Sequence, residues 1–259
     1  MAAVALCGCS NGGNGLADGQ INALIASFGT EEPGDVSTAD SIGATAAATA
    51  IYEVNPDDQS IEVSWDKGPM ALMTRKFVPA GGGIYEPEDE SLNGSLLVMT
   101  PTANTIVALG TVIPGDSTSG AHGIVFAGTA PTNIPPSGTL SYTKTDGVLV
   151  EHVAFENNIC DLGCLGDVSI DANFATGGVT GTFSNFDNGV SNIGFAGTMS
   201  AQNTLYSANS MTYGGTATNG KLYGGFFGDG AMETAGVFDI GSGTTRFIGG
   251  YGAAAPPPP

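Results

Sequence analysis

The second half of the chain is a run of short apolar stretches separated by turn residues, and this pattern constrains the fold more than any other feature. Strand-like stretches lie at 138–145, 148–157, 166–174, 177–186, 191–201, 207–216, 220–228, 233–240 and 244–252. The short connections carry turn sequences, namely Asp146-Gly147, Gly177-Gly178, Asn188-Gly189, Asn219-Gly220, Asp229-Gly230 and Gly241-Ser242-Gly243. Consecutive short connections predict an antiparallel up-and-down meander. Closing eight such strands into a barrel removes both exposed edges, and side chains can just fill its interior.

Glycine and phenylalanine support the barrel prediction. The chain has 41 glycines in 259 residues, about twice the usual share of ~7%. Many lie inside the predicted strands, where a small barrel that coils tightly can use them. We expect phenylalanines of these strands to fill much of the interior: Phe155, Phe174, Phe183, Phe195, Phe226 and Phe238.

The first half of the chain is predicted to form a smaller β-rich subdomain over residues 16–130. Apolar residues at Ile21, Leu24, Ile25 and Phe28 have helical spacing and predict one short helix over 19–28. After it, 51–54 and 60–65 read as a hairpin, and further strands are expected at 92–99, 105–113 and 123–127. The acidic run 86–90 is expected to be a solvated loop rather than a calcium site, because it lacks alternating oxygen ligands.

Charge excludes several classes of partner. The chain carries 25 acidic and 6 basic residues, a net charge of −19. Nucleic acids and anionic lipid surfaces are bound by clusters of lysine and arginine, so neither partner is expected. No apolar run reaches the ~18 residues of a membrane-spanning helix.

The two ends of the chain are predicted to be processing or tail segments. Leu6-Cys7-Gly8-Cys9 has the form of a bacterial lipobox, in which Cys9 would receive lipid and become the new N-terminus. No basic residue precedes it, so residues 1–15 read as a truncated signal and tether; the alternative is an unstructured start that happens to hold two cysteines. Residues 254–259 form a short proline-rich tail that is expected to be frayed.

No constellation of residues indicates catalysis, a cofactor or a metal. His122 and His152 have no accompanying serine or cysteine motif, and no zinc-ligand spacing is present. We therefore expect a protein that is not an enzyme. Cys160 and Cys164 lie close enough to form a disulfide in an exported chain, with two free thiols as the alternative.

Several stretches of the second half resemble the barrel domain of transferrin-binding protein B and its relatives. Gly128-Thr-Ala-Pro-Thr132 followed by Pro136-Ser-Gly-Thr-Leu-Ser-Tyr142 resembles the entry into the first barrel strand of that family. The most specific stretch is Leu222–Phe238, which is similar to the family's "G-x-F-Y-G-P-x-A-x-E-x-G-G-x-F" signature. Asp229-Gly230 replaces the usual proline, and Ala235 replaces a common glycine. The matched positions, all read as structural, are Gly138, Tyr142, Gly225, Phe226, Gly228, Glu233, Gly236 and Phe238.

Two of these positions have an expected physical role. Glu233 is expected to accept backbone N–H bonds at the turn that precedes it, as turn carboxylates commonly do. Gly236 is expected to leave room for an aromatic ring such as Phe226 or Phe238.

The resemblance implies an all-β chain with a C-terminal eight-stranded barrel at 131–253, preceded by a handle-like subdomain. It further implies a lipoprotein anchored to the bacterial outer membrane at its periplasmic or cell-surface face. Such a protein binds a macromolecule or small solute through loops and handle, without a cofactor; the partner is unknown and a monomer is expected. The alternative is a structural outer-membrane lipoprotein without a specific ligand.

Overall fold

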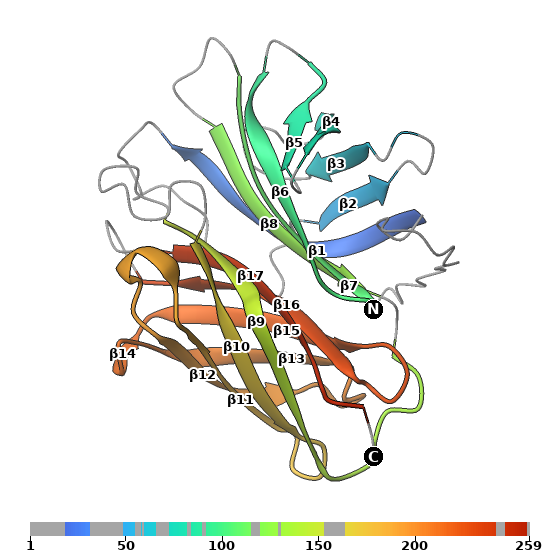
Figure 1. Ribbon diagram of the computed structural model, residues 1–259, viewed down its shortest axis with the longest axis vertical. Helices are drawn as coiled ribbons and strands as arrows, with labels where there is room; N and C mark the ends of the chain where they lie inside the picture. The colour runs from blue at the N-terminus through green and yellow to red at the C-terminus, as the bar shows by residue number, and fades with distance from the viewer. Residues whose placement is uncertain are drawn as a thin grey trace.

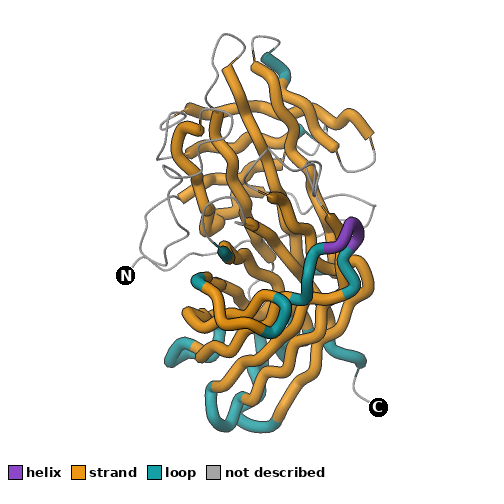
Figure 2. The backbone as a smooth tube through the Cα atoms, turned by 90° about the vertical axis from the view of Figure 1, so that its left-hand side faces the viewer, coloured by secondary structure: helices purple, strands orange, loops and turns teal. Residues whose placement is uncertain are grey.

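The chain folds into two β-barrels that lie one above the other along the long axis of the molecule (Figure 1). The computed structural model describes residues 19–31, 49–54, 58, 60–65, 73–81, 84–89, 92–114, 120–128, 131–152, 164–241 and 247–257. Figure 2 shows the same two bodies from the side, with strands in most of the described backbone. Within these ranges no helix is long and apolar enough to cross a membrane. The predicted all-β class is confirmed.

The first eight strands close into the N-terminal barrel. They are β1 (Gly19–Glu31), β2 (Thr49–Val54), β3 (Ile61–Trp65), β4 (Met73–Gly81), β5 (Ile84–Pro87), β6 (Leu92–Thr102), β7 (Thr105–Pro114) and β8 (Gly120–Gly128). Each pairs with the next, and β1 pairs with β8 to complete the circle. The predicted hairpin of 51–54 and 60–65 is β2 paired with β3. The β-rich character of this half is therefore as predicted. Its closure into a barrel is a feature that the sequence did not predict.

The helix predicted over 19–28 is wrong, because this segment is the strand β1. Gln20 and Ile21 pair with Glu53 and Tyr52 of β2, while Ile25 and Ala26 pair with Val125 and Ile124 of β8. A strand flanked on both edges satisfies its backbone groups through its neighbours, so tertiary pairing outweighs the local helical spacing.

The remaining strands form the C-terminal barrel. They are β9 (Thr139–His152), β10 (Cys164–Asn173), β11 (Gly178–Ser184), β12 (Ile193–Met199), β13 (Leu205–Tyr213), β14 (Thr216–Thr218), β15 (Gly220–Phe227), β16 (Glu233–Ile240) and β17 (Phe247–Ala254). A 3-10 turn, η3 (Asp187–Gly189), precedes β12. The pairings β12–β13, β13–β15 and β17–β9 close a ring of eight strands, which confirms the predicted eight-stranded antiparallel barrel. Strand β14 pairs with the end of β13 and, among the strands that the structure describes, stands outside the ring.

The predicted turn at Asp146-Gly147 does not separate two strands. Both residues lie inside the continuous strand β9, where Asp146 has a φ of 52°. The register of β10 against β9 shifts at this place, between Gly166 and Val168. Asp146 and Gly147 therefore form a bulge that bends one long strand around the barrel.

Aromatic side chains fill the C-terminal barrel, as predicted. Phe174, Phe183, Phe195, Phe226 and Phe238 are all buried in one core cluster, whereas Phe155 lies outside the described residues. The ring of Phe183 stacks on that of Phe238 with centroids 5.0 Å apart. The interior is consequently a packed core, as expected for eight strands.

The C-terminal tail begins later than predicted. Ala253 and Ala255 belong to the buried core cluster, and the N–H of Ala255 donates to the carbonyl of Met232 at 2.8 Å. The expectation that the chain frays from residue 254 is therefore wrong for Ala254, which belongs to β17, and for Ala255. Small side chains permit the last strand to pack against the barrel end up to Ala255.

Candidate functional site

The turn between β15 and β16 carries the centre of the signature and is held in an unusual backbone conformation. Gly228, Gly230 and Ala231 all have positive φ, at 72°, 67° and 56°. The N–H of Ala231 donates to the carbonyl of Gly228 at 3.3 Å. Glycine tolerates this region without strain, but alanine does not. The conformation of Ala231 therefore needs support from the surrounding structure.

Tyr142 supplies part of that support from inside the barrel. Its hydroxyl donates to the carbonyl of Ala231 at 2.7 Å, and its ring stacks on Phe226 with centroids 5.8 Å apart. The side chain is fully buried. Burial raises the pKa of Tyr142 above its ordinary value, with a smaller contribution from Tyr206. The first strand of the barrel is thereby fixed to the signature turn.

The segment joining the two barrels lies across the same turn. Thr132 donates its N–H to Gly228 at 3.3 Å and accepts the N–H of Gly230 at 2.8 Å. The Asp229 carboxylate accepts from the Thr132 hydroxyl and from Asn133 Nδ2, both at 2.7 Å. These hydrogen bonds, that of Thr132 first, lower the pKa of Asp229. The signature turn therefore fastens the inter-barrel linker.

Glu233 connects the turn to the N-terminal barrel. Its side chain is 8% exposed, and Oε2 accepts from the Thr102 hydroxyl and, at 2.8 Å, from the N–H of Asn104. Oε1 accepts from Asn104 Nδ2 at 2.6 Å. The sequence predicted that Glu233 accepts backbone N–H groups at its own turn. Among the bonds that the structure gives it, the backbone donor lies instead in the β6–β7 turn, about 130 residues earlier.

Two of the signature glycines differ in how closely they are packed. A Cβ on Gly236 would lie 2.4 Å from both the carbonyl oxygen of Tyr223 and the hydroxyl of Tyr251. The aromatic side chain nearest to Gly236 is thus Tyr251. The sequence had instead suggested Phe226 or Phe238. A Cβ on Gly225 would lie 3.2 Å from the side-chain ends of Leu205 and Phe227. A side chain at position 236 would clash with a backbone carbonyl, so glycine is required there. A side chain at position 225 would meet only the ends of neighbouring side chains, so glycine is less strictly required.

The other signature residues organise the core. Gly138 has a φ of 96°, and its carbonyl accepts the N–H of Phe174 at 2.8 Å. Phe226 packs against Phe174 and Tyr206, with ring centroids 5.1 Å and 5.0 Å away. These contacts are structural. They position the barrel ends but offer no reacting group.

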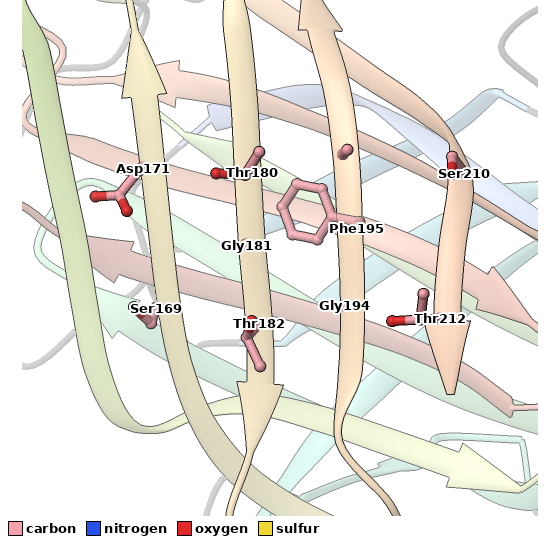
Figure 3. Close-up of a pocket in the computed structure, with 10 residues that line it drawn as sticks. Ser169, Asp171, Thr180, Gly181, Thr182, Gly194, Phe195, Ser210 and Thr212 are labelled. Atoms are coloured by element: carbon pink, nitrogen blue, oxygen red, sulfur yellow. The ribbon is translucent and has the colours of Figure 1, made fainter. Parts of the chain in front are cut away.

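A polar depression of about 410 Å³ lies on the outer wall of the C-terminal barrel (Figure 3). It spans β10 to β13, and its lining consists mainly of short hydroxyl-bearing and small residues: Ser169, Asp171, Thr180, Gly181, Thr182, Gly194, Phe195, Ala196, Ser210 and Thr212. The Asp171 carboxylate accepts from Ser141 at 2.5 Å. The lining offers hydrogen-bond donors and acceptors and one negative charge, but no basic side chain for an anion.

The acidic run predicted as a solvated loop is only partly a loop. Glu86 and Pro87 belong to β5, and Glu88 follows in a bend. Lys76 Nζ contacts Glu88 at 2.9 Å and Asp58 at 3.4 Å. The hydrogen bond to Glu88 is the main cause that raises the pKa of Lys76. The pKa of Asp58 is lowered, chiefly by hydrogen bonding to Ser60. Lys76 on β4 therefore pairs with one carboxylate that follows β5 and with another that precedes β3.

The cysteines and histidines are only partly within the described residues. Cys164 is buried at the start of β10 and is disulfide-bonded. Cys9 and Cys160 lie outside the described residues, so lipidation at Cys9 and the Cys160–Cys164 pairing stay predictions. His122 lies on β8 and His152 at the end of β9. In the part of the chain that the structure describes, no group of three or more potential metal ligands comes together.

Sequence reasoning missed the partners of the signature carboxylates. Thr102 and Asn104 donate hydrogen bonds to Glu233. Thr132 and Asn133 donate hydrogen bonds to Asp229. Thr102-Ala103-Asn104 between two strand-like runs was recognisable as a polar turn. Nothing in one sequence shows which distant carboxylate such a turn meets.

The C-terminal barrel matches a known family in sequence. Residues 134–255 match the family model described as the C-lobe and N-lobe beta barrels of Tf-binding protein B. This match confirms the resemblance to transferrin-binding protein B over the barrel. A search of curated proteins found no match for the chain.

Solved structures of similar proteins share low identity with this chain. A transferrin-binding protein B mutant from Actinobacillus pleuropneumoniae H49 is 14% identical, with 90% of this chain and 100% of that chain covered and a TM-score of 0.47. The isotype 1 protein from serogroup B Neisseria meningitidis is 12% identical, with coverages of 91% and 58% and a TM-score of 0.46. The lactoferrin-binding protein B N-lobe of Moraxella bovis is 12% identical, with coverages of 92% and 99% and a TM-score of 0.38.

Proposed function

We propose that this chain, whose C-terminal barrel is of the transferrin-binding protein B type, is a non-enzymatic lipoprotein of the bacterial envelope that binds a partner. The observation that carries the proposal is the match of residues 134–255 to that family of barrels. Relatives in this family are named for the proteins they bind. Fold alone does not specify a ligand, so the partner, a macromolecule or a small solute, has to be identified by experiment.

The packing of the barrel supports binding at the outer surface. Buried aromatic and aliphatic side chains form one continuous core in the C-terminal barrel. A filled interior leaves the loops, the outer wall and the N-terminal barrel as contact surfaces. The net charge of −19 favours a partner with a complementary basic surface or one recognised without charge.

Lipid attachment at Cys9 would place the protein at the outer membrane. The motif Leu6-Cys7-Gly8-Cys9 is the basis for this part of the proposal, and Ser10 after the cysteine fits export to the outer membrane. Mass spectrometry of the protein purified from native membranes tests it. We expect an N-terminus at Cys9 carrying acyl chains. An unmodified N-terminus at Met1 or Ala2 would overturn lipid anchoring, and protease treatment of intact cells would identify the membrane face.

The binding proposal is tested with the full chain immobilised through its C-terminus. The probes are transferrin, lactoferrin, haemin, a ferric siderophore and the soluble proteins of the natural growth environment. We expect one saturable ligand that a heat-unfolded sample of the same chain does not retain. Folded, lipid-anchored protein that retains none of these probes would overturn the proposal in favour of a structural envelope protein.

A further inference from the structure

The two barrels meet through an apolar interface. Val107, Ile124 and Phe126 from β7 and β8 pack in one buried cluster against the outer wall of the C-terminal barrel. The residues contributed by that wall are Leu149, Phe227, Ala235, Val237 and Ile248. Phe126 and Phe227 meet edge to face with centroids 6.2 Å apart. Burying this surface favours association of the barrels, but the hydrophobic effect has little directionality.

The approach of the barrels is close because β17 lacks side chains at two outward positions. A Cβ on Gly250 would lie 2.3 Å from Val107, and a Cβ on Gly252 would lie 2.2 Å from Pro101. Both neighbours belong to the N-terminal barrel. Val107 and Pro101 therefore lie directly against the backbone of β17, at a separation that a side chain on Gly250 or Gly252 would have to increase.

Glu233 lies beside this apolar surface and has directional requirements. Both of its carboxylate oxygens accept hydrogen bonds from the β6–β7 turn, through Thr102 and Asn104. Thr105 completes the arrangement, because its hydroxyl lies 2.5 Å from that of Thr102, whose proton faces the carboxylate. A desolvated carboxylate without such donors is strongly unfavourable. A placement that still covered Glu233 but moved this turn away would leave its charge without these donors.

We propose that Glu233 is a positioning residue that selects one orientation of the N-terminal barrel on the C-terminal barrel. The apolar surface holds the barrels together, and the carboxylate excludes shifted or rotated placements. Loops of both barrels are then presented as one preorganised surface, and a partner that contacts both meets them without an ordering cost. This inference does not depend on which partner the chain binds.

Backbone residual dipolar couplings of the full chain, measured by NMR, test the proposal. In the native protein we expect one alignment tensor to fit the amides of both barrels. In Glu233→Gln the charge is lost and one carboxylate oxygen is replaced by an NH2 group that faces a donor of the β6–β7 turn, so each barrel should fit its own tensor with different magnitudes. The matched control is Asp171→Asn, the equivalent change at an exposed carboxylate on the same barrel's outer wall. It should keep the single tensor.

A second variant separates positioning from a role in barrel folding. Thr102→Val removes the hydroxyl donor from the opposite barrel, with Thr180→Val on the outer wall as its control. We expect Thr102→Val to give two tensors while core chemical shifts of both barrels stay native. A single tensor in both Glu233→Gln and Thr102→Val would overturn the proposal. Loss of the C-terminal core shifts in both variants would also overturn it, because Glu233 would then be needed for the barrel itself.

Discussion

The phenolic oxygens of Tyr206 and Tyr251 lie 2.7 Å apart inside the C-terminal barrel, although their strands β13 and β17 share no ladder. Tyr206 also contacts Thr234 Oγ1 at 2.7 Å, and that hydroxyl donates to the carbonyl of Gly225 at 2.9 Å. Since the Thr234 proton is used, Tyr206 donates to Thr234 and Tyr251 donates to Tyr206. A series of hydrogen bonds thus crosses an otherwise apolar core, and each hydroxyl donates its proton to the next oxygen in the series.

Removing the central hydroxyl of this chain should destabilise the protein. Tyr206→Phe leaves Tyr251 without its acceptor, so we expect a loss of about 1–3 kcal/mol in the free energy of unfolding. Tyr251→Phe removes only a donor to Tyr206 and should cost less. Urea unfolding of the full chain measures both, with Tyr223→Phe as the half-buried control. A cost for Tyr251→Phe that exceeds that of Tyr206→Phe would contradict this proton order.

The same tyrosines predict an alkaline limit to stability. Burial raises the pKa of Tyr206 to about 12 and that of Tyr251 well above its ordinary value. Because the unfolded state ionises near pH 10, the contribution is complete below that pH and is lost as pH rises toward the folded-state pKa. Tyrosinate absorbance and circular dichroism, recorded together, should show that the most buried tyrosines ionise only as the barrel unfolds. Full ionisation with an intact barrel would disprove this.

Substitution of the two signature glycines should have unequal effects. Gly236→Ala places a methyl group against a backbone carbonyl and the Tyr251 hydroxyl, and overpacking of this kind costs about 1–3 kcal/mol or more. Gly225→Ala meets only the ends of side chains, including that of Leu205, which is 48% exposed. Thermal melting of the full chain should show a much lower midpoint for Gly236→Ala than for Gly225→Ala. Equal midpoints would mean that the strands adjust more freely than the structure indicates.

Acid should loosen the inter-barrel linker before it unfolds the barrels. The pKa of Asp229 is lowered by Thr132 and Asn133, so its stabilising contribution is present above the unfolded-state value near 4 and disappears as pH falls through the folded-state pKa. Hydrogen exchange at the N–H groups of Thr132 and Gly230 should show reduced protection below that pH. In Asp229→Ala the protection should already be low at neutral pH and should not change with acidification.

We predict that the disulfide partner of Cys164 is Cys160. Four cysteines occur in the chain, and the other two, Cys7 and Cys9, lie at the N-terminus. Non-reducing peptide mapping of protein from the envelope should recover one peptide pair joining 160 and 164. Because the loop closed is short, Cys160→Ser should lower the unfolding midpoint only slightly. Alkylation of both thiols without reduction would exclude the bridge.

The C-terminal barrel was predictable because short-range sequence features, the turns between neighbouring strands and the alternation along each strand, determine most of it. Tight turns at Gly177-Gly178 and Asp229-Gly230 join consecutive strands that pair with each other, and alternation then assigns the buried phenylalanines. The strand boundaries differ from those predicted by only a few residues, apart from β9, where the Asp146 bulge resembles a turn in sequence.

Other features depend on distant contacts and escaped prediction. The apolar residues of β1 have helical spacing, and only pairing with β2 and β8 shows that they form a strand. Likewise, strand β5 was not predicted, because its last two residues belong to the acidic run 86–90. Its pairing with β4 and β6 depends on closure of the barrel. Deleting 86–90 would therefore remove part of a barrel wall, and not merely a surface loop.

The pairing of β9 with β17 has a consequence for how the protein is made. These are the first and last strands of the C-terminal barrel, and their partners are about 100 residues apart along the chain. The N-terminal barrel needs only residues up to Gly128 for its own ring, so it can assemble while synthesis continues. The second ring has to wait for its final segment, with its edges open in the meantime. Non-local closure of this kind is slow and leaves the nascent chain prone to aggregation. A chaperone that covers unpaired strands would have most to protect in the interval before β17 arrives.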